Sequence, residues 1–240
     1  MKWKSISVAT SMLFEIGLVL SPVTSIHADG IPYLTAGQSG IPRMDVVDVA
    51  SYQGNLTVND YKIMKSYGVK GVIVKLTEGT NYKNPYAQTQ ITNAKAAGLT
   101  VGAYHYSQFN SESGARDEAN YFASAARSLG LGNDVVMADD LEDSATKHGN
   151  IQANVMAFAN QLKSNGYHRP ILYTYQSYVS STGLNPSAFG DSNIWMASYP
   201  YAPSSDNLWF TNYGMWQFNS NSHFPGVSGT FDVTLIIKML

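Results

Sequence analysis

Residues 69–106 read VKGVIVKLTEGTNYKNPYAQTQITNAKAAGLTVGAYHY, and they contain the unit from which the fold can be predicted. The apolar run at Val69–Leu76 predicts a strand. Tyr86–Ala97 predicts a helix that ends at Gly98, because glycine readily adopts the left-handed conformation that closes many helices. Thr100–Tyr106 predicts the next strand. A strand, a helix and a second strand within about 30 residues are typical of a parallel β/α unit.

The same alternation continues on both sides of this unit. Strands are expected at residues 44–52, 135–141 and 170–175, and helices near residues 61–67, 115–129 and 151–162, with glycines 68, 130 and 166 as the stops. Three later strands are expected at residues 194–199, 213–218 and 230–237, but the intervals between them lack a long amphipathic helix. The sequence therefore predicts an α/β fold, an irregular β/α barrel with five β/α units followed by three further strands. A regular eight-fold barrel is the alternative, although ~200 residues is at its lower limit.

The composition excludes several classes of protein. The chain has 240 residues and no cysteine, so disulfides, zinc–thiolate sites and cysteine nucleophiles are excluded. A formal net charge of −2 gives no indication of the basic face that nucleic acids require. His148, His168 and His223 lack the spacing of metal ligands, and we expect no metal and no cofactor. Aromatic residues reach 12% against 13% charged residues, which suits contact with sugars, although most rings are expected in the core.

The N-terminus has the pattern of a secretory signal peptide. Lys2 and Lys4 precede an apolar stretch at residues 6–23, and Ala28 offers a small residue at a cleavage point. Glu15 is unusual within that stretch, and an uncleaved membrane anchor is the alternative. We expect residues 1–28 to be the signal peptide, residues 29–43 a short leader rich in glycine and proline, and residues 44–240 one folded domain.

Polar residues gather where the expected strands end. Barrels of this kind carry their active sites at the C-terminal ends of the parallel strands. The candidates at these ends are Asp48, Glu78, Tyr104, His105, Tyr106, Asp140 and Glu142.

The fourth strand runs into four carboxylates within five residues. Such a run is usually a solvated face, but this one follows the apolar residues 135–138. Residues i and i+2 of a strand share a face, so Asp140 and Glu142 are expected to point together. Asp139 and Asp143 then point the other way or lie in the loop. Two carboxylates held close together raise the pKa of one of them, which yields the proton donor that glycoside cleavage requires.

Eight segments in one order resemble glycoside hydrolase family 25, the lysozymes that include phage endolysins and bacterial autolysins. They are DVASYQG (48–54), VIVKLTEGTNY (72–82), VGAYHY (101–106), DLE (140–142), ILYTY (171–175), IWMASY (194–199), MWQF (215–218) and FDV (231–233). The resemblance covers about residues 44–240, which would be the catalytic domain. It implies an irregular β/α barrel that cleaves the β-1,4 bond between N-acetylmuramic acid and N-acetylglucosamine in peptidoglycan.

The resemblance also implies roles for single residues. By position, Glu142 corresponds to the general acid/base and Asp140 to its carboxylate partner, while Asp48 and Asp232 correspond to acidic residues of the same cleft. Positions that resemble cleft or support residues are Glu78, Tyr104, Tyr173, Trp195 and Gln217. We expect His105 to line the cleft, with a structural histidine as the alternative. For Trp195 and Trp216 a sugar platform and a core ring are equally open.

The sequence departs from the family pattern at two positions. Thr234 stands two places after the last aspartate, where the family often has asparagine, and Asp139 precedes the D-x-E segment, where an apolar residue is usual. Neither departure removes a catalytic carboxylate.

The resemblance leads to several expectations about the whole protein. We expect a secreted, cell-wall-associated monomer whose partner is the glycan strand of peptidoglycan, with no nucleic acid and, after signal removal, no membrane. A non-catalytic peptidoglycan-binding module and a chitinase-like hydrolase are the alternatives, although the chitinase motif D-x-x-D-x-D-x-E is absent. Retention of anomeric configuration, assisted by the N-acetyl group of the substrate, is expected from the substrate and not from spacing, because the D-x-E spacing is compatible with either outcome.

Overall fold

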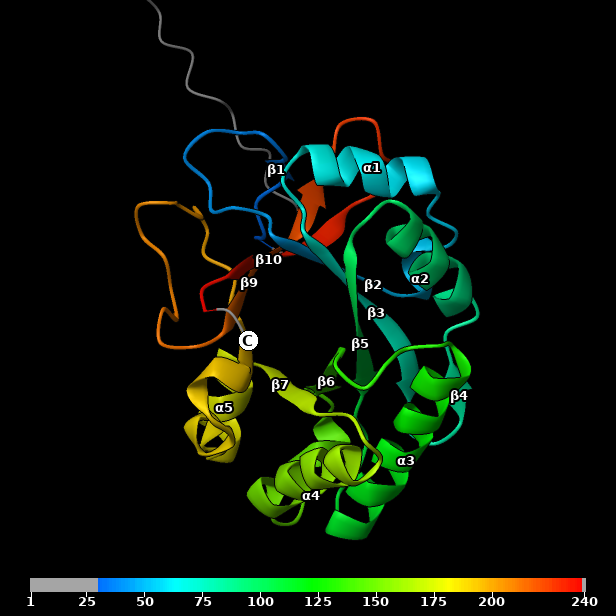
Figure 1. The fold of residues 1–240 in the computed structure, drawn as a ribbon. Coiled ribbons are helices and arrows are strands. Elements are labelled where there is room, and N and C mark those ends of the chain that lie inside the picture. The colour runs from blue at the N-terminus through cyan, green and yellow to red at the C-terminus, as the bar shows by residue number, and fades with distance from the viewer. Residues whose placement is uncertain (1–29, 239–240) are drawn as a thin grey trace, which may run out of the picture.

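The computed structural model describes residues 30–238, and within them eight strands close into a barrel (Figure 1). The ring runs β9-β10-β2-β3-β5-β6-β7-β8, and β8 pairs back onto β9. Neighbours are parallel except at β10, which is antiparallel to both β2 and β9. The barrel strands are β2 (Val46–Val49), β3 (Gly71–Glu78), β5 (Thr100–Tyr106), β6 (Val136–Asp140), β7 (Arg169–Tyr175), β8 (Ile194–Ala197), β9 (Met215–His223) and β10 (Phe231–Ile236).

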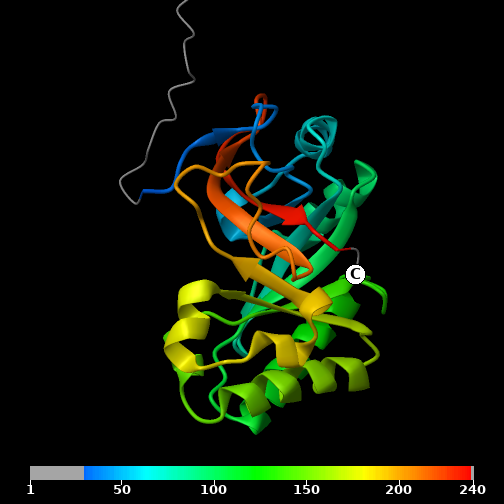
Figure 2. The same ribbon diagram turned by 90° about the vertical axis from the view of Figure 1, so that its left-hand side faces the viewer.

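Helices lie around the barrel in an arc (Figure 1), and in the turned view some lie above the strands and others below them (Figure 2). They are α1 (Val58–Ser66), α2 (Ala87–Ala96), α3 (Glu112–Ser128), α4 (Ile151–Ser164) and the short α5 (Gln176–Thr182). Single 3-10 turns lie at Ser51–Gln53, Ser144–Lys147, Pro186–Phe189 and Asp191–Asn193. Side chains fix the helix starts: at α1, Thr57 and Asp60 satisfy each other's backbone N–H groups. The irregular barrel predicted from the spacing of the strands is confirmed.

The alternation of side chains sets the two layers of the core. Outward residues such as Val47 and Val74 pack under the helices, while the interior is filled by Val46, Ile73, Ala138 and further apolar residues. One step of two residues further along β6, the interior residue is Asp140. The apolar floor therefore gives way to a polar layer at the C-terminal end of the barrel.

Two strand predictions needed correction. β9 extends five residues beyond the expected end at Phe218, because polar residues such as Asn219 and Ser222 are buried there and paired. The segment expected to be a short leader before the domain contains β1 (Leu34–Thr35), which pairs with β9 in parallel. Leu34 and Ala36 belong to the core, so part of this segment packs against the barrel.

Two further expectations concern the N-terminus and membranes. The predicted signal peptide at residues 1–28 lies outside the described residues. No helix in residues 30–238 has the length and apolar character needed to cross a membrane.

Candidate active site

Seven of the predicted site residues line one small cavity of about 90 Å³ at the C-terminal mouth of the barrel. These seven residues lie in, or directly after, six different strands, so most of them are far apart in the sequence. They are Asp48, Tyr104, Asp140, Glu142, Tyr173, Trp195 and Asp232. Four of the seven carry carboxyl groups, so the cavity concentrates acid in a buried place.

Asp48 and Asp232 face each other across β2 and β10, where they are register partners. The Nε2 of Gln217 donates to the Oδ2 of Asp48 at 2.9 Å. The Oε1 of Gln217 accepts from the hydroxyls of Tyr173 at 2.8 Å and Tyr199 at 2.6 Å, so both ends of this amide are engaged. Burial and the neighbouring Asp232 raise the pKa of Asp48 well above its ordinary value. Burial and Glu142 raise the pKa of Asp232 to about 7, so this pair holds a proton near neutral pH.

Asp140 and Glu142 form the second acidic pair. Asp140 is only 7% exposed, and within residues 30–238 its Oδ1 has no hydrogen-bond partner. Burial, and then the charge of Glu142, raise the pKa of Asp140 well above its ordinary value. Burial also raises the pKa of Glu142, while Lys75 opposes the shift in both groups. These two carboxyls therefore line the cavity and keep a proton to higher pH than exposed carboxyls do.

Lys75 is a site residue that the sequence reasoning missed. Its Nζ pairs with the Oε2 of Glu78 at 2.7 Å and lies 4.8 Å from the centre of the Tyr106 ring. Glu78 also accepts from the Nε2 of Gln108 at 3.1 Å, so it fixes the lysine and does not line the cavity. The available signal was a lone lysine two residues after Ile73 in an apolar strand, which places it on the interior face.

His105 does not line the cleft, so that prediction is wrong. The side chain is fully buried on the outer face of β5, where Nδ1 lies 2.8 Å from the Oγ1 of Thr77 and Nε2 lies 2.8 Å from the Oε2 of Glu118. The ring packs against Phe122 and Phe158. Because Tyr104 points inward, its neighbour in the strand must point toward α3 and α4.

Asp139 lies on the outer face of β6, as alternation predicts. It is 1% exposed and accepts a hydrogen bond from the hydroxyl of Ser107. Burial raises its pKa to about 8. The Asp139 departure therefore places an uncharged acid behind the sheet at neutral pH, away from the cavity.

Trp195, Trp216 and Gln217 are almost fully buried, and of the three only Trp195 lines the acidic cavity. Trp195 is 2% exposed, and its Nε1 donates to the Oγ1 of Thr234 at 3.0 Å, which accounts for the threonine at that position. Trp216 is fully buried and stacks on Trp209, so it is a core ring. Gln217 is 1% exposed and supports Asp48.

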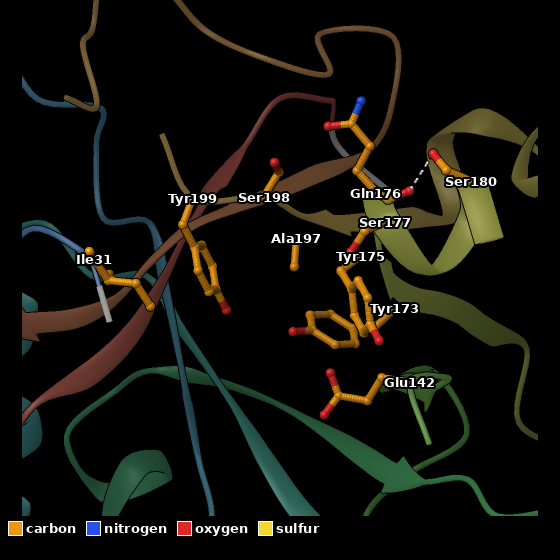
Figure 3. Close-up of a pocket in the computed structure, with 11 residues that line it drawn as sticks. Ile31, Glu142, Tyr173, Tyr175, Gln176, Ser177, Ser180, Ala197, Ser198 and Tyr199 are labelled. Atoms are coloured by element: carbon orange, nitrogen blue, oxygen red, sulfur yellow. Dashed lines mark hydrogen bonds between the residues drawn. The ribbon is translucent and has the colours of Figure 1, made fainter. Parts of the chain in front are cut away.

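A larger cleft of about 610 Å³ adjoins the acidic cavity and shares Glu142 and Tyr173 with it (Figure 3). Its other lining residues were not predicted: Gly30, Ile31, Tyr175, Gln176, Ser177, Ser180, Ala197, Ser198 and Tyr199. Tyr175 could have been found from its place two residues after Tyr173. Ile31 and Gly30 gave no signal, because they lie in a stretch without periodicity. Among the eleven lining residues within residues 30–238, only Glu142 has an acidic or basic side chain.

The site holds no arrangement suited to a metal within residues 30–238, where no group of three His, Asp or Glu side chains is placed to bind one. Buried carboxyls of raised pKa beside a cleft rich in hydroxyl groups and aromatic rings are the arrangement of a glycoside hydrolase. The fold and the site thus define a barrel-type glycoside hydrolase.

The comparisons with known proteins agree with this class. The sequence profile of glycosyl hydrolases family 25 matches residues 47–227, and the chain belongs to that family. Lysozyme M1 of Streptomyces globisporus is 27% identical over 82% of this chain and 69% of the relative. The autolytic lysozyme of Clostridium acetobutylicum is 31% identical over 79% of this chain but only 55% of the relative, so the chain spans about half of that protein. The crystal structure of a Streptomyces coelicolor lysozyme superposes with a TM-score of 0.65 at 26% identity, covering 83% of this chain and 93% of that one.

Proposed function

We propose that the protein is a lysozyme that hydrolyses the β-1,4 bond between N-acetylmuramic acid and N-acetylglucosamine in peptidoglycan. The observation that carries the proposal is the cavity in which Asp48, Asp140, Glu142 and Asp232 meet at the mouth of the barrel. Burying four carboxyl groups together costs stability, and a protein that only bound glycans would gain nothing from it.

Glu142 is the proton donor in this proposal. It lines both the acidic cavity and the larger cleft, so it lies where a glycan strand would pass from one to the other. Burial raises its pKa and keeps it protonated to higher pH than an exposed glutamate. A protonated carboxyl at this position can transfer its proton to the oxygen of the leaving sugar.

Asp140 assists the substrate in the same step. Both sugars of peptidoglycan carry a 2-acetamido group, whose carbonyl oxygen can attack the anomeric carbon. The carboxylate of Asp140, which lines the cavity, would accept a hydrogen bond from the amide N–H and stabilise the positive charge that develops there. Water then opens the intermediate with Glu142 as the base, and the configuration is retained.

Asp48 and Asp232 bind and orient the sugar in the cavity. Their shared proton and the fixed amide of Gln217 provide both donors and acceptors toward sugar hydroxyls. Asp48 and Asp232 can therefore keep the same total charge when the substrate binds.

The proposal extends to the location of the protein. Removal of residues 1–28 as a signal peptide would release residues 29–240 as a monomeric enzyme that acts on the cell wall. Its partner is then the glycan strand of peptidoglycan outside the cell.

Loss of turbidity with purified Gram-positive cell walls tests the function, with insoluble chitin as the matched control. We expect lysis of walls and little release of sugar from chitin. A folded protein that binds walls without releasing reducing ends would indicate a non-catalytic module, and equal activity on chitin would indicate the chitinase-like alternative. NMR of freshly released reducing sugar should show the β-anomer first, whereas initial α-anomer would mean inversion by an activated water.

A further inference from the structure

We propose that residues 30–36, here called the N-terminal strap, form one wall of the substrate cleft, and that Ile31 contacts an uncharged N-acetylated sugar of the bound glycan. This inference rests on the proposed function and adds a substrate-contacting residue to it. The family profile matches from residue 47 onward, so the strap lies outside the matched region.

The strap is held rigidly against the barrel. Its residues Leu34–Thr35 pair in parallel with β9, opposite Ser222 and His223. The Nδ2 of the fully buried Asn219 donates to the carbonyl oxygen of Pro32 at 2.8 Å, which is directly next to Ile31. A wall fixed in this way loses little freedom when a ligand binds, so contacts with it contribute to affinity.

Ile31 stands at the edge of the cleft. Figure 3 shows Ile31 beside Tyr199 on one side, with Tyr175 and Gln176 across the cleft and Glu142 below. The side chain of Ile31 is half-buried, so part of its surface is accessible to a ligand in the cleft.

The lining of the cleft indicates the chemistry of what covers it. Apart from Glu142, the walls offer hydroxyls, one amide, aromatic rings and the methyl groups of Ile31 and Ala197. Hydroxyls and the amide of Gln176 suit sugar hydroxyls, while Ile31 and Ala197 suit the methyl of an acetamido group or the apolar face of a pyranose. Among residues 30–238, no lysine or arginine lines the cleft to receive a carboxylate, which favours a neutral sugar unit here.

The test compares Ile31→Ala with Ile41→Ala. Ile41 is a half-buried isoleucine of the same N-terminal segment that packs on the core and does not line the cleft, so it controls for general loosening. Both changes are made in the Glu142→Gln background and titrated by calorimetry with a soluble tetrasaccharide of alternating N-acetylglucosamine and N-acetylmuramic acid. We expect Ile31→Ala to raise Kd about 3- to 10-fold and Ile41→Ala to leave it nearly unchanged, because only Ile31 loses apolar contact with the sugar.

Kinetics of the same variants in the active enzyme separate binding from chemistry. Ile31→Ala should raise KM with kcat nearly unchanged, as expected for a contact made equally in ground and transition states. Equal Kd and KM for the two variants would overturn the role of Ile31 while leaving the lysozyme function intact. Failure of the Glu142→Gln parent to bind the tetrasaccharide at all would overturn both.

Discussion

At the scale of single residues, neighbouring acids in one strand have opposite roles because the strand alternates. Asp140 lines the acidic cavity, whereas Asp139 is hydrogen-bonded to Ser107 behind the sheet. The same alternation separates Tyr104 from His105 one strand away. The type of a residue therefore does not determine its role here. The role depends on whether the side chain lies on the inner or the outer face of the strand.

Glu142→Gln should reduce wall lysis by about 10² or more, because glutamine keeps the shape but has no proton to donate. The matched control is Glu112→Gln, which removes a carboxylate from the exposed first turn of α3. Initial rates of turbidity loss with both purified proteins measure the difference. Near-normal lysis by folded Glu142→Gln would refute its assignment as the proton donor.

Lys75→Met should move the whole pH–activity profile to higher pH. Lys75 opposes the raised pKa of both Asp140 and Glu142, so its removal raises both values further. Ionised Asp140 is then scarcer at low pH and protonated Glu142 persists to higher pH, so kcat/KM near pH 5 should fall by about 3-fold or more. The other groups that act on this pair are Asp48, Asp139 and Asp143, and all three remain.

Lys83→Met is the control for Lys75→Met. Lys83 lies in β4 (Tyr82–Lys83) over the ring of Tyr121 and does not line the acidic cavity, so the change removes an equal charge outside the site. Its pH profile should match that of the wild type. Identical profiles for the two lysine variants would show that Lys75 does not tune the pair.

At the scale of elements, β6 is the strand on which both faces carry acid. Its inner face supplies Asp140 to the cavity, and its outer face buries Asp139 near Glu118 of α3. The α3 side of this contact is also polar, because Glu118 is bound to His105 and to the backbone N–H of Gln108. The contact of α3 with β5 and β6 thus contains three titratable side chains, His105, Glu118 and Asp139.

Asp139→Asn should keep most activity and make stability less dependent on pH. The folded protein holds a proton on Asp139 up to about pH 8, whereas an unfolded aspartate loses it near pH 4. Between these values the folded state binds more protons, so the free energy of unfolding falls as pH rises, by about 1.4 kcal/mol per pH unit from this group. Asparagine removes that contribution.

Urea denaturation at pH 5, 6 and 7 measures this slope. The control is Asp117→Asn, a change at an exposed position of α3 that should run parallel to the wild type. Asp140→Asn should by contrast lose activity. A slope unchanged by Asp139→Asn, or equal loss of activity in the Asp139 and Asp140 variants, would contradict the assigned faces of β6.

At the scale of the whole molecule, the barrel is covered unequally. Helices α1 to α4 enclose one side, while β8, β9 and β10 are bordered by loops, the short α5 and the N-terminal strap (Figures 1 and 2). The large cleft lies on this second side, between α5 and the strap. The region without long helices is thus the region that opens to substrate.

The exported protein should begin at or close to Asp29. Cleavage after Ala28 leaves Gly30 and Ile31 near the new N-terminus, beside the cleft. Mass spectrometry of material secreted into the medium measures the terminus directly. Recovery only from membranes, with Met1 intact, would support the anchor alternative that Glu15 raises.

Local patterns were sufficient to predict the barrel and most of its acidic cavity. Strand spacings of about 30 and then about 20 residues indicate where helices connect strands, and the residue after an apolar run falls at the strand end. Asp48, Asp140 and Asp232 were found in this way with the help of family resemblance, and Thr100–Tyr106 has the bounds predicted for it. The positions of strands and of the residues at their ends depend on amino acids a few positions away in the sequence, and a sequence pattern shows these directly.

The tertiary structure alone decided which distant groups meet. Gln217 bonds to Asp48 from 169 residues away, and residue 31 reaches the cleft only because β1 adds to β9. His105 was misplaced because the sequence shows that side chains of β5 alternate but does not show which of them face inward. Only the packing of α3 and α4 on the strand determines this. Such contacts form between segments whose separation along the chain carries no pattern. These contacts form only when the barrel closes, because closure brings all the strands together.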